Sequence, residues 1–466
     1  MNTNELFKRL RGGQQMTTSQ QIELAVWLAL PSIIAQLSSI IMQYIDASMV
    51  GHLGANASGS IGLVATTTWL FGGMCHSAVT GFSVQVAHRI GAKDAAGARS
   101  VLRQGIVSIL IIACGLSFIG LCIHRHLPIW LGGNKDIVED ASAYLCIYML
   151  NLPFMGMYHL ASAMLRCSGN TRVPGILGSM MCLLDVVFNL LLIFPERTLH
   201  LGGMELYMPG AGLGVKGAAL GTMAATLTIA MLTWYFLAFR SAELNIFHHH
   251  GSYRLKRDCI RKAIKIGGPI SLEHAVMCGA QVVCTAIVAP LGVVAIAANA
   301  FAVTAESICY MPGYGIADAA TTLTGQTIGA GRKELCKHFA FITIGMGMAV
   351  MSVMGILMYL CAPYMMSLLT PVGEICELGT SVLRIEAFAE PMFAASIVAY
   401  GVFIGSGDTV VPCTMNFASI WLVRITLTYF LAPIWGLQGV WIAMAIELCF
   451  RGSIFLIHYK RGKWLR

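Results

Sequence analysis

Acidic side chains stand inside stretches of the chain that are otherwise almost entirely apolar. Asp46 ends one such stretch, and Asp185 lies within another. A carboxylate at the centre of a bilayer costs roughly 2.5–3.5 kcal/mol on insertion scales. Because a medium of low dielectric constant disfavours the charged form, a carboxyl in that position can take up and release a proton. The two aspartates therefore indicate a site for a proton or a sodium ion. The alternative is structural, a protonated carboxyl held in a hydrogen-bonded helix interface.

Two further residues extend this candidate site. Asn189 follows Asp185 by four residues, so both side chains would share a helix face and the amide oxygen could join the ligands of a cation. Pro31 precedes Asp46 by 15 residues on the same predicted helix. Proline removes a backbone hydrogen bond and creates a bend point, and a bend that follows the charge of nearby acids would couple ion binding to conformation. Intact ion-coupled transport by a Pro31→Ala variant would refute that hypothesis.

The carboxyl-terminal half carries more acids in its apolar stretches. They are Glu273, Glu306, Asp318, Glu386, Glu390 and Glu447. Glu447 and Arg451 are four residues apart and can neutralise each other on one helix face. Glu386 and Glu390 can be balanced in a similar way by nearby arginines, with Arg384 and Arg424 as the candidates. For these acids a structural ion pair and a functional site both remain open.

The composition predicts an integral membrane protein that positions these acids on membrane-spanning helices. The 466 residues are 57% hydrophobic and 11% charged, with a mean hydropathy of +0.73. Soluble domains carry about 25% charged residues. A span needs about 20 mainly apolar residues, and twelve such segments begin near residues 22, 57, 101, 139, 173, 213, 263, 297, 338, 380, 411 and 436. The first is longer than the apolar region of a signal peptide and is expected to be retained.

The basic residues indicate how the chain is oriented. The net charge of +8 comes from short clusters in alternate connections, which is the positive-inside pattern and not that of a nucleic-acid-binding surface. Both termini are therefore predicted to be cytoplasmic.

An internal repeat divides the chain into two halves. Pro31 and Pro269 are 238 residues apart, and the same offset places "SGNTRVP" (168–174) on "SGDTVVP" (406–412). We predict an all-α membrane protein with twelve transmembrane helices in two six-helix bundles. Because six is even, the halves are parallel repeats, a plan that usually places the substrate site between them. The predicted domains are an amino-terminal lobe (1–239), a cytoplasmic linker (240–262) and a carboxyl-terminal lobe (263–466).

The sequence lacks the motifs that are typical of several other functions. The sequence holds no GxxxxGK[ST], HExxH or GxSxG, so an ATP-driven pump or a membrane-embedded enzyme is disfavoured. The one GxGxxG match, "GLGVKG" at 212–217, enters an apolar helix, where close helix packing explains its glycines better than nucleotide binding. The fifteen cysteines contain no CxxC pair and indicate buried thiols. No enzymatic activity, no cofactor and no metal beyond Na⁺ are expected.

Together these residues resemble the multidrug and toxic compound extrusion (MATE) family of antiporters. The resemblance covers almost the whole chain and rests on motifs in both halves. They are Pro31, Gln36, Asp46 and "VGHLG" (50–54) in the first helix, "LRCSGNTRVP" (165–174), "GLGVKGAALGT" (212–222), "GGPISLEH" (267–274), the segment 305–331 and "HYKRGKW" (458–464).

The resemblance implies export driven by a gradient of H⁺ or Na⁺, and it assigns residues to that task. The family's amino-lobe cation site corresponds to Asp46, Asp185 with Asn189, and Thr222. Here the fifth helix carries aspartate first and asparagine a turn later, the reverse of the order in many members. In the other lobe Glu273 resembles the family's acid on the seventh helix. Glu306 and Glu390 lie in segments where relatives also carry acids.

The sequence thus predicts a secondary active multidrug exporter of amphipathic organic cations. It is expected to act as a monomer among membrane lipids, in a bacterial inner membrane. The main alternative is a flippase for a lipid-linked precursor, which would need basic groups facing its cleft to bind phosphates. Eight acids against three arginines in the spans disfavour that alternative.

Overall fold

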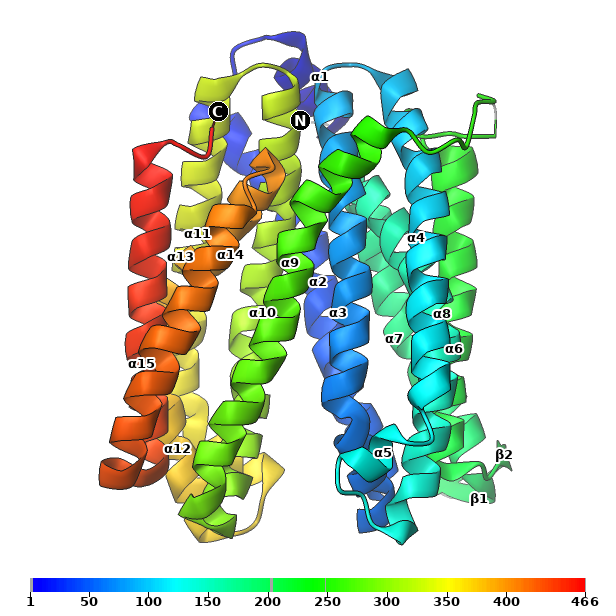
Figure 1. The fold of residues 1–466 in the computed structure, drawn as a ribbon, viewed down its shortest axis with the longest axis vertical. Helices are drawn as coiled ribbons and strands as arrows, with labels where there is room; N and C mark the ends of the chain where they lie inside the picture. Colours follow the sequence, from blue (N-terminus) through cyan, green and yellow to red (C-terminus); the bar gives the residue numbers. More distant parts are fainter. Residues whose placement is uncertain (1–2, 202–203, 248, 466) are drawn as a thin grey trace. The chain divides into compact units, whose positions relative to one another are not determined.

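Long helices dominate the chain (Figure 1). The computed structural model describes residues 3–201, 204–247 and 249–465. The first half contains α1 (Thr3–Gly12), α2 (Thr18–Gly51), α3 (Ala55–Gly91), α4 (Ala95–Ile123), α5 (Leu127–Trp130), α6 (Lys135–Cys167), α7 (Arg172–Ile193), strands β1 (Pro195–Leu201) and β2 (Met204–Ala211), α8 (Gly214–Tyr235) and a π-helical turn η1 (Phe236–Arg240). The second half contains α9 (Arg257–Val288), η2 (Ala289–Leu291), α10 (Val293–Gly329), α11 (Lys333–Leu369), α12 (Gly373–Ala387), α13 (Glu390–Ser406), α14 (Val410–Ala418), a π-helical segment η3 (Ser419–Ile425) and α15 (Thr426–Arg461).

The helices account for all twelve predicted spans. Among the described residues, eight helices are long and apolar enough to cross a membrane, and the pair α12–α13, bent by 59°, makes a ninth span. Helices α3 and α6 are less apolar but, at 37 and 33 residues, are also long enough to cross. The segment Val410–Arg461 breaks at Gly436, where φ is 59° and ψ is −137°, and therefore supplies two spans.

The repeat is visible in matching turns. Gly169 ends the turn after α6 with φ of 95°, and Gly407 ends α13 with φ of 84°. Glycine adopts this left-handed conformation without steric strain, which is why it commonly ends helices. The next residues, Asn170 and Asp408, both donate their backbone N–H to a carbonyl five residues earlier. The shared "SG-x-T" sequence thus encodes the same helix end in both halves.

Two compact units emerge from the contacts. The first-half unit comprises Ser38–Val86 and Ala95–Ile264, and the second-half unit comprises Met1–Leu37, Ala87–Asp94 and Lys265–Arg466. Their boundary falls inside α2, between Leu37 and Ser38.

In the first-half unit, α6 packs against α4 and α8, and α7 packs against α8. The segment before α8 forms the antiparallel hairpin β1–β2. After α8, the chain is tied back to α4. Arg99 donates to the backbone oxygen of Glu243, Arg103 donates to that of His249, and Gln104 Oε1 accepts the backbone N–H of Lys256. This part of the predicted linker is therefore held along one helix.

In the second-half unit, α10 packs against α11, α12 and α13, and α13 packs against α15. The short helix α1, which the sequence analysis did not predict, buries Leu6, Phe7 and Leu10 in the core of this unit. A reciprocal contact joins the ends of α3 and α10. A Cβ on Gly91 would lie 2.1 Å from the backbone oxygen of Gln326, and one on Gly329 would lie 2.0 Å from that of His88. Both glycines thus permit a close helix crossing.

Candidate functional site

The two aspartates of the first half meet at one amide. Asn189 Nδ2 on α7 donates to Asp46 Oδ1 on α2 at 2.9 Å and to Asp185 Oδ2 on α7 at 3.0 Å. The carboxyl groups of Asp46 and Asp185 lie within electrostatic reach of each other, and the side chain of Thr222 on α8 lies beside Asp185. The four amino-lobe residues predicted from the sequence therefore lie together, although they come from three helices.

This cluster contains buried hydrogen-bond acceptors that lack a donor among the described residues. Asp185 and Asn189 are each only 1% exposed. Within the described residues, Asp185 Oδ1 and Asn189 Oδ1 have no hydrogen-bond partner, and no ion pair neutralises Asp46 or Asp185. A buried acceptor without a partner is costly and usually marks an unseen ion, water or proton. Carboxylate, amide and hydroxyl oxygens are also the ligands that hard cations such as Na⁺ take.

Close packing of α7 against α8 brings these groups together. A Cβ on Gly217 would lie 2.4 Å from the backbone oxygen of Leu192, and one on Gly221 would lie 2.1 Å from Asn189 Oδ1. Small residues let membrane helices approach each other in this way. Of the three motif glycines of "GLGVKG", Gly217 serves close helix packing as predicted, whereas Gly212 and Gly214, at the start of α8, have φ of 62° and 57° and instead supply a turn.

One neighbour of this site was not predicted from the sequence. Tyr144 on α6 lies within electrostatic reach of both Asp46 and Asp185, and it packs in the apolar cluster around Met49 and Ile193. A single tyrosine in an apolar segment carries no distinctive sequence signal, so only the fold could reveal it.

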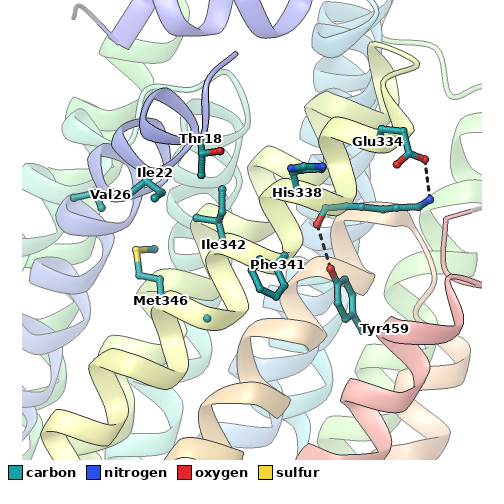
Figure 2. A pocket seen from close by; sticks show the side chains of 11 residues that line it. Thr18, Ile22, Val26, Glu334, His338, Phe341, Ile342, Met346 and Tyr459 are labelled. Carbon is teal, nitrogen blue, oxygen red and sulfur yellow. Dashed lines mark hydrogen bonds and ion pairs between the residues drawn. The ribbon is translucent and has the colours of Figure 1, made fainter. Parts of the chain in front are cut away.

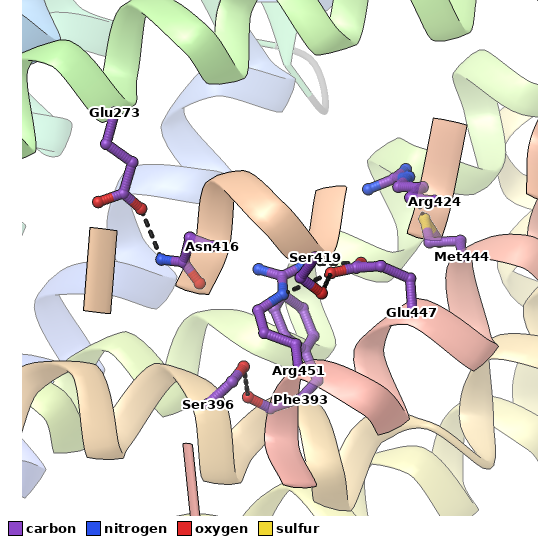
Figure 3. Close-up of polar contacts among 9 residues, drawn as sticks. All are labelled: Glu273, Phe393, Ser396, Asn416, Ser419, Arg424, Met444, Glu447 and Arg451. Carbon is purple, nitrogen blue, oxygen red and sulfur yellow. Dashed lines mark hydrogen bonds and ion pairs between the residues drawn. The ribbon is translucent and has the colours of Figure 1, made fainter. Parts of the chain in front are cut away.

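The second-half unit holds a different acid site around Glu273 on α9 (Figure 3). Its Oε2 accepts the Tyr400 hydroxyl at 2.5 Å and the Cys413 thiol at 2.9 Å, and its Oε1 accepts Asn416 Nδ2 at 2.6 Å. Unlike Asp185, this carboxyl is hydrogen-bonded through both oxygens.

Three more acids lie apart from these hydrogen bonds. Glu306 on α10, Glu386 on α12 and Glu390 on α13 are 6%, 0% and 0% exposed and interact electrostatically with one another. In the described part of the chain, no carboxyl oxygen of Glu386 or Glu390 has a hydrogen-bond partner. Helix α12 ends between these two residues, so they belong to differently directed helices.

Within the described residues, neither of the two candidate arginines forms an ion pair with these acids. Arg384 donates to the backbone oxygen of Tyr359 and stacks over its ring, because positions two apart on a helix face different directions. Arg424 points toward Met444 Sδ, with 2.8 Å between donor and sulfur (Figure 3). It reaches Glu306 and Glu386 electrostatically, without an ion pair. Of the two alternatives left open for Glu386 and Glu390, the structural ion pair is therefore not observed among the described residues.

The predicted pair of Glu447 and Arg451 is confirmed. Arg451 Nε and Nη2 each donate to one Glu447 oxygen at 2.8 Å, and Ser419 on η3 adds a bond of 2.5 Å (Figure 3). This bidentate geometry is the strongest that an arginine and a carboxylate adopt. These two groups are structural partners and leave no free charge.

Two repeated bundles that span a membrane twelve times, with unpaired acids inside, define a multi-pass membrane transporter. The profile of the MatE family matches this chain twice, over residues 31–191 and 269–430. The two matches begin 238 residues apart, the offset of the internal repeat. The chain belongs to the MatE family, and the resemblance noted from its motifs is confirmed.

Bacterial relatives align over nearly the whole chain. A protein of Thermotoga maritima, "Probable multidrug resistance protein NorM", is 24% identical, with 94% of this chain and 92% of the relative covered. A Pseudomonas aeruginosa protein of the same name is 27% identical over 92% and 88%.

Solved structures share the fold at lower identity. An outward-facing multidrug resistance MATE family transporter gives a TM-score of 0.87 at 20% identity, covering 95% of each chain. A MATE crystal structure in the straight conformation gives 0.86 at 19%, covering 98% and 97%.

Proposed function

We propose that this protein is a secondary active exporter that exchanges H⁺ or Na⁺ for organic cations across a bacterial inner membrane. The main support for this proposal is the buried cluster of Asp46, Asp185 and Asn189. It combines two acids with two oxygens that have no hydrogen-bond partner among the described residues. The names of the bacterial relatives, which refer to multidrug resistance, support the substrate class and the cell type. Both termini then face the cytoplasm, as the basic connections suggest.

The coupling ion binds in the amino-lobe cluster. When protonated, Asp46 or Asp185 can donate a hydrogen bond to the open oxygen of its neighbour. When ionised, both can bind Na⁺ together with Asn189 Oδ1 and the Thr222 hydroxyl. In either case binding neutralises buried charge, so the two states of the site favour different helix arrangements. Pro31, on the same helix as Asp46, supplies the bend point through which that difference acts.

The acids of the second-half unit serve the organic cation. Glu273 is oriented by three donors, whereas Glu386 and Glu390, with Glu306 within electrostatic reach, are buried acids whose oxygens have no hydrogen-bond partner among the described residues. Soft methionine and aromatic walls repack around cations of varied shape. A lipid-linked precursor flippase is less well supported, because Arg451 is already paired and phosphates would meet mainly acids.

The test is transport of a lipophilic dye cation into proteoliposomes under an imposed pH gradient or Na⁺ gradient. The native chain is compared with Asp46→Asn, which keeps the size of the side chain and removes its charge. We expect gradient-driven transport by the native chain and a fall to the level of empty liposomes in the variant. Normal dye binding, followed by tryptophan fluorescence, would show that the variant is folded. Equal transport by both chains would exclude Asp46 as the coupling residue and direct attention to Glu273.

A further inference from the structure

An apolar groove with a charged rim lies in the second-half unit, outside the acid clusters (Figure 2). Its volume is about 750 Å³, and its walls are the first turns of α2, the first half of α11 and the end of α15. On α2, Ile22 and Val26 are spaced by four residues and present one face, and on α11 Ile342 and Met346, also four residues apart, lie toward them, with Phe341 beside them. These side chains form the floor of the groove.

The rim of the groove is polar. Glu334, Lys337 and His338 lie in the first two turns of α11, and the Tyr459 hydroxyl of α15 donates to the backbone oxygen of Lys337 at 3.2 Å. From Glu334 to Met346 the helix rises about 18 Å, at 1.5 Å per residue. The groove therefore changes from charged to apolar over roughly the distance from a lipid headgroup into the acyl region.

The floor is open toward the surroundings. Ile22, Val26 and Phe341 are 45%, 43% and 70% exposed. Gly345 is exposed as well, and a Cβ placed on it would meet nothing within 4 Å. In a membrane such a hollow is filled by a chain of comparable width. Acyl chains are as apolar outside the groove as inside it, so selectivity must come from the rim.

The chain segments that flank the rim carry net positive charge, although the rim itself pairs one lysine with one glutamate. Lys337 Nζ contacts Glu334 Oε1 at 2.8 Å, but both side chains are exposed, at 48% and 80%, and such a pair is easily rearranged. Around it, residues 332–338 and 458–463 contain six lysines and arginines and only one acid. Basic residues at the membrane surface attract anionic lipids.

We propose that this groove binds one anionic phospholipid, with an acyl chain along the floor and the phosphate at Lys337 and His338. The lipid would hold the start of α2, upstream of Pro31, against α11. The inference depends on the membrane-spanning fold and not on the proposed coupling mechanism.

The test measures binding of the first lipid to the purified full-length chain by native mass spectrometry. Dioleoyl phosphatidylglycerol, phosphatidylethanolamine and phosphatidylcholine are compared. We expect phosphatidylglycerol to bind about fivefold more tightly than either zwitterionic lipid, the factor that one basic residue near the surface supplies. Lys337→Gln should remove most of this preference, whereas Lys262→Gln, an exposed lysine of α9, should keep it.

A second pair of variants tests the floor. Gly345→Leu places a side chain in the groove at a position where an added Cβ meets nothing within 4 Å, and Gly115→Leu adds the same side chain to an equally open, exposed position of α4. The first should abolish the preference for phosphatidylglycerol and the second should retain it. Equal binding of the three lipids, or a preference that survives Gly345→Leu, would overturn the proposal. Tighter binding of phosphatidylethanolamine would overturn the anionic assignment, because the headgroup would then be recognised by the Glu334–Lys337 pair.

Discussion

The two halves of the chain share a frame of helices and turns, but their acidic residues lie at different positions. At the repeat offset of 238, Asp46 corresponds to Cys284 and Asp185 to Val423, while Glu273 corresponds to Ala35. The residues that do repeat, such as Gly169 and Gly407, form turns and helix ends. The repeat has thus preserved backbone geometry, and each half has acquired its own site on it.

The acid sites also differ in how completely they are hydrogen-bonded. Glu273 receives three donors, and Glu447 is held by Arg451 and Ser419. By contrast, the first-half cluster shares a single amide between two aspartates and leaves oxygens open. A satisfied carboxyl favours one structure, whereas an unsatisfied one depends on what binds to it. We therefore expect the second-half pairs to govern stability and the first-half cluster to respond to ions.

The largest effect on stability should come from breaking the buried pair of Glu447 and Arg451. Their side chains are 0% and 10% exposed. Arg451→Met would leave the carboxylate buried without its cation, and we expect the free energy of unfolding to fall by about 3–5 kcal/mol. Unfolding in mixed detergent micelles, followed by tryptophan fluorescence, measures the change.

The matched control replaces both members. In Glu447→Met with Arg451→Met no charge is left unpaired, and similar apolar volume fills the site. Such replacements are often neutral or stabilising, so most of the loss should be restored. If the double variant were as unstable as Arg451→Met, the pair would contribute through more than charge balance, and the contrast between the halves would weaken.

Sequence patterns could predict the frame because the frame is repetitive. Twelve apolar segments, the offset of 238 and the pair at Glu447 and Arg451 all follow local periodicities that side-chain chemistry enforces. Asn189 could be placed beside Asp185 from helical spacing alone. The contact of Asn189 with Asp46 could not be, because it joins residues 143 positions apart.

Other features escaped the sequence for identifiable reasons. Helix α1 is only ten residues long and resembles a polar terminus until Leu6 and Leu10 are seen in the core. Arg384 was a plausible partner for Glu386 by proximity, but the helix directs the two side chains apart. Opposite charges close in sequence predict an ion pair only at spacings of three or four in a helix.

At one position of the sixth helix, the two halves of the chain differ by one methyl group. Gly221 corresponds to Ala443 at the offset of 222 that relates the sixth helices of the two halves. In the first half a Cβ there would lie 2.1 Å from Asn189 Oδ1. Gly221→Ala should displace the Asn189 amide, lower the free energy of unfolding by about 1–3 kcal/mol, as overpacking does, and impair gradient-driven transport.

A matched glycine separates packing from helix propensity. Gly115 on α4 has nothing within 4 Å of its would-be Cβ. Because alanine favours a helix over glycine by about 1 kcal/mol, Gly115→Ala should be neutral or slightly stabilising. Equal stability of the two alanine variants would mean that the α7–α8 contact relaxes easily and that Asn189 is not fixed by Gly221.

The smallest effect concerns Glu386, the acid that most resembles the first-half cluster in lacking partners. It is 0% exposed, and neither carboxyl oxygen has a partner among the described residues. An unsatisfied buried polar group costs about 1–3 kcal/mol, so Glu386→Met, of similar volume, should leave stability unchanged or raise it by about 1 kcal/mol. Glu447→Met should instead lower it, because Arg451 would lose its partner. Measured in the same unfolding assay, these opposite signs would distinguish an acid retained for function from one retained for structure. A loss of stability in Glu386→Met equal to that in Glu447→Met would place both acids in the structural class.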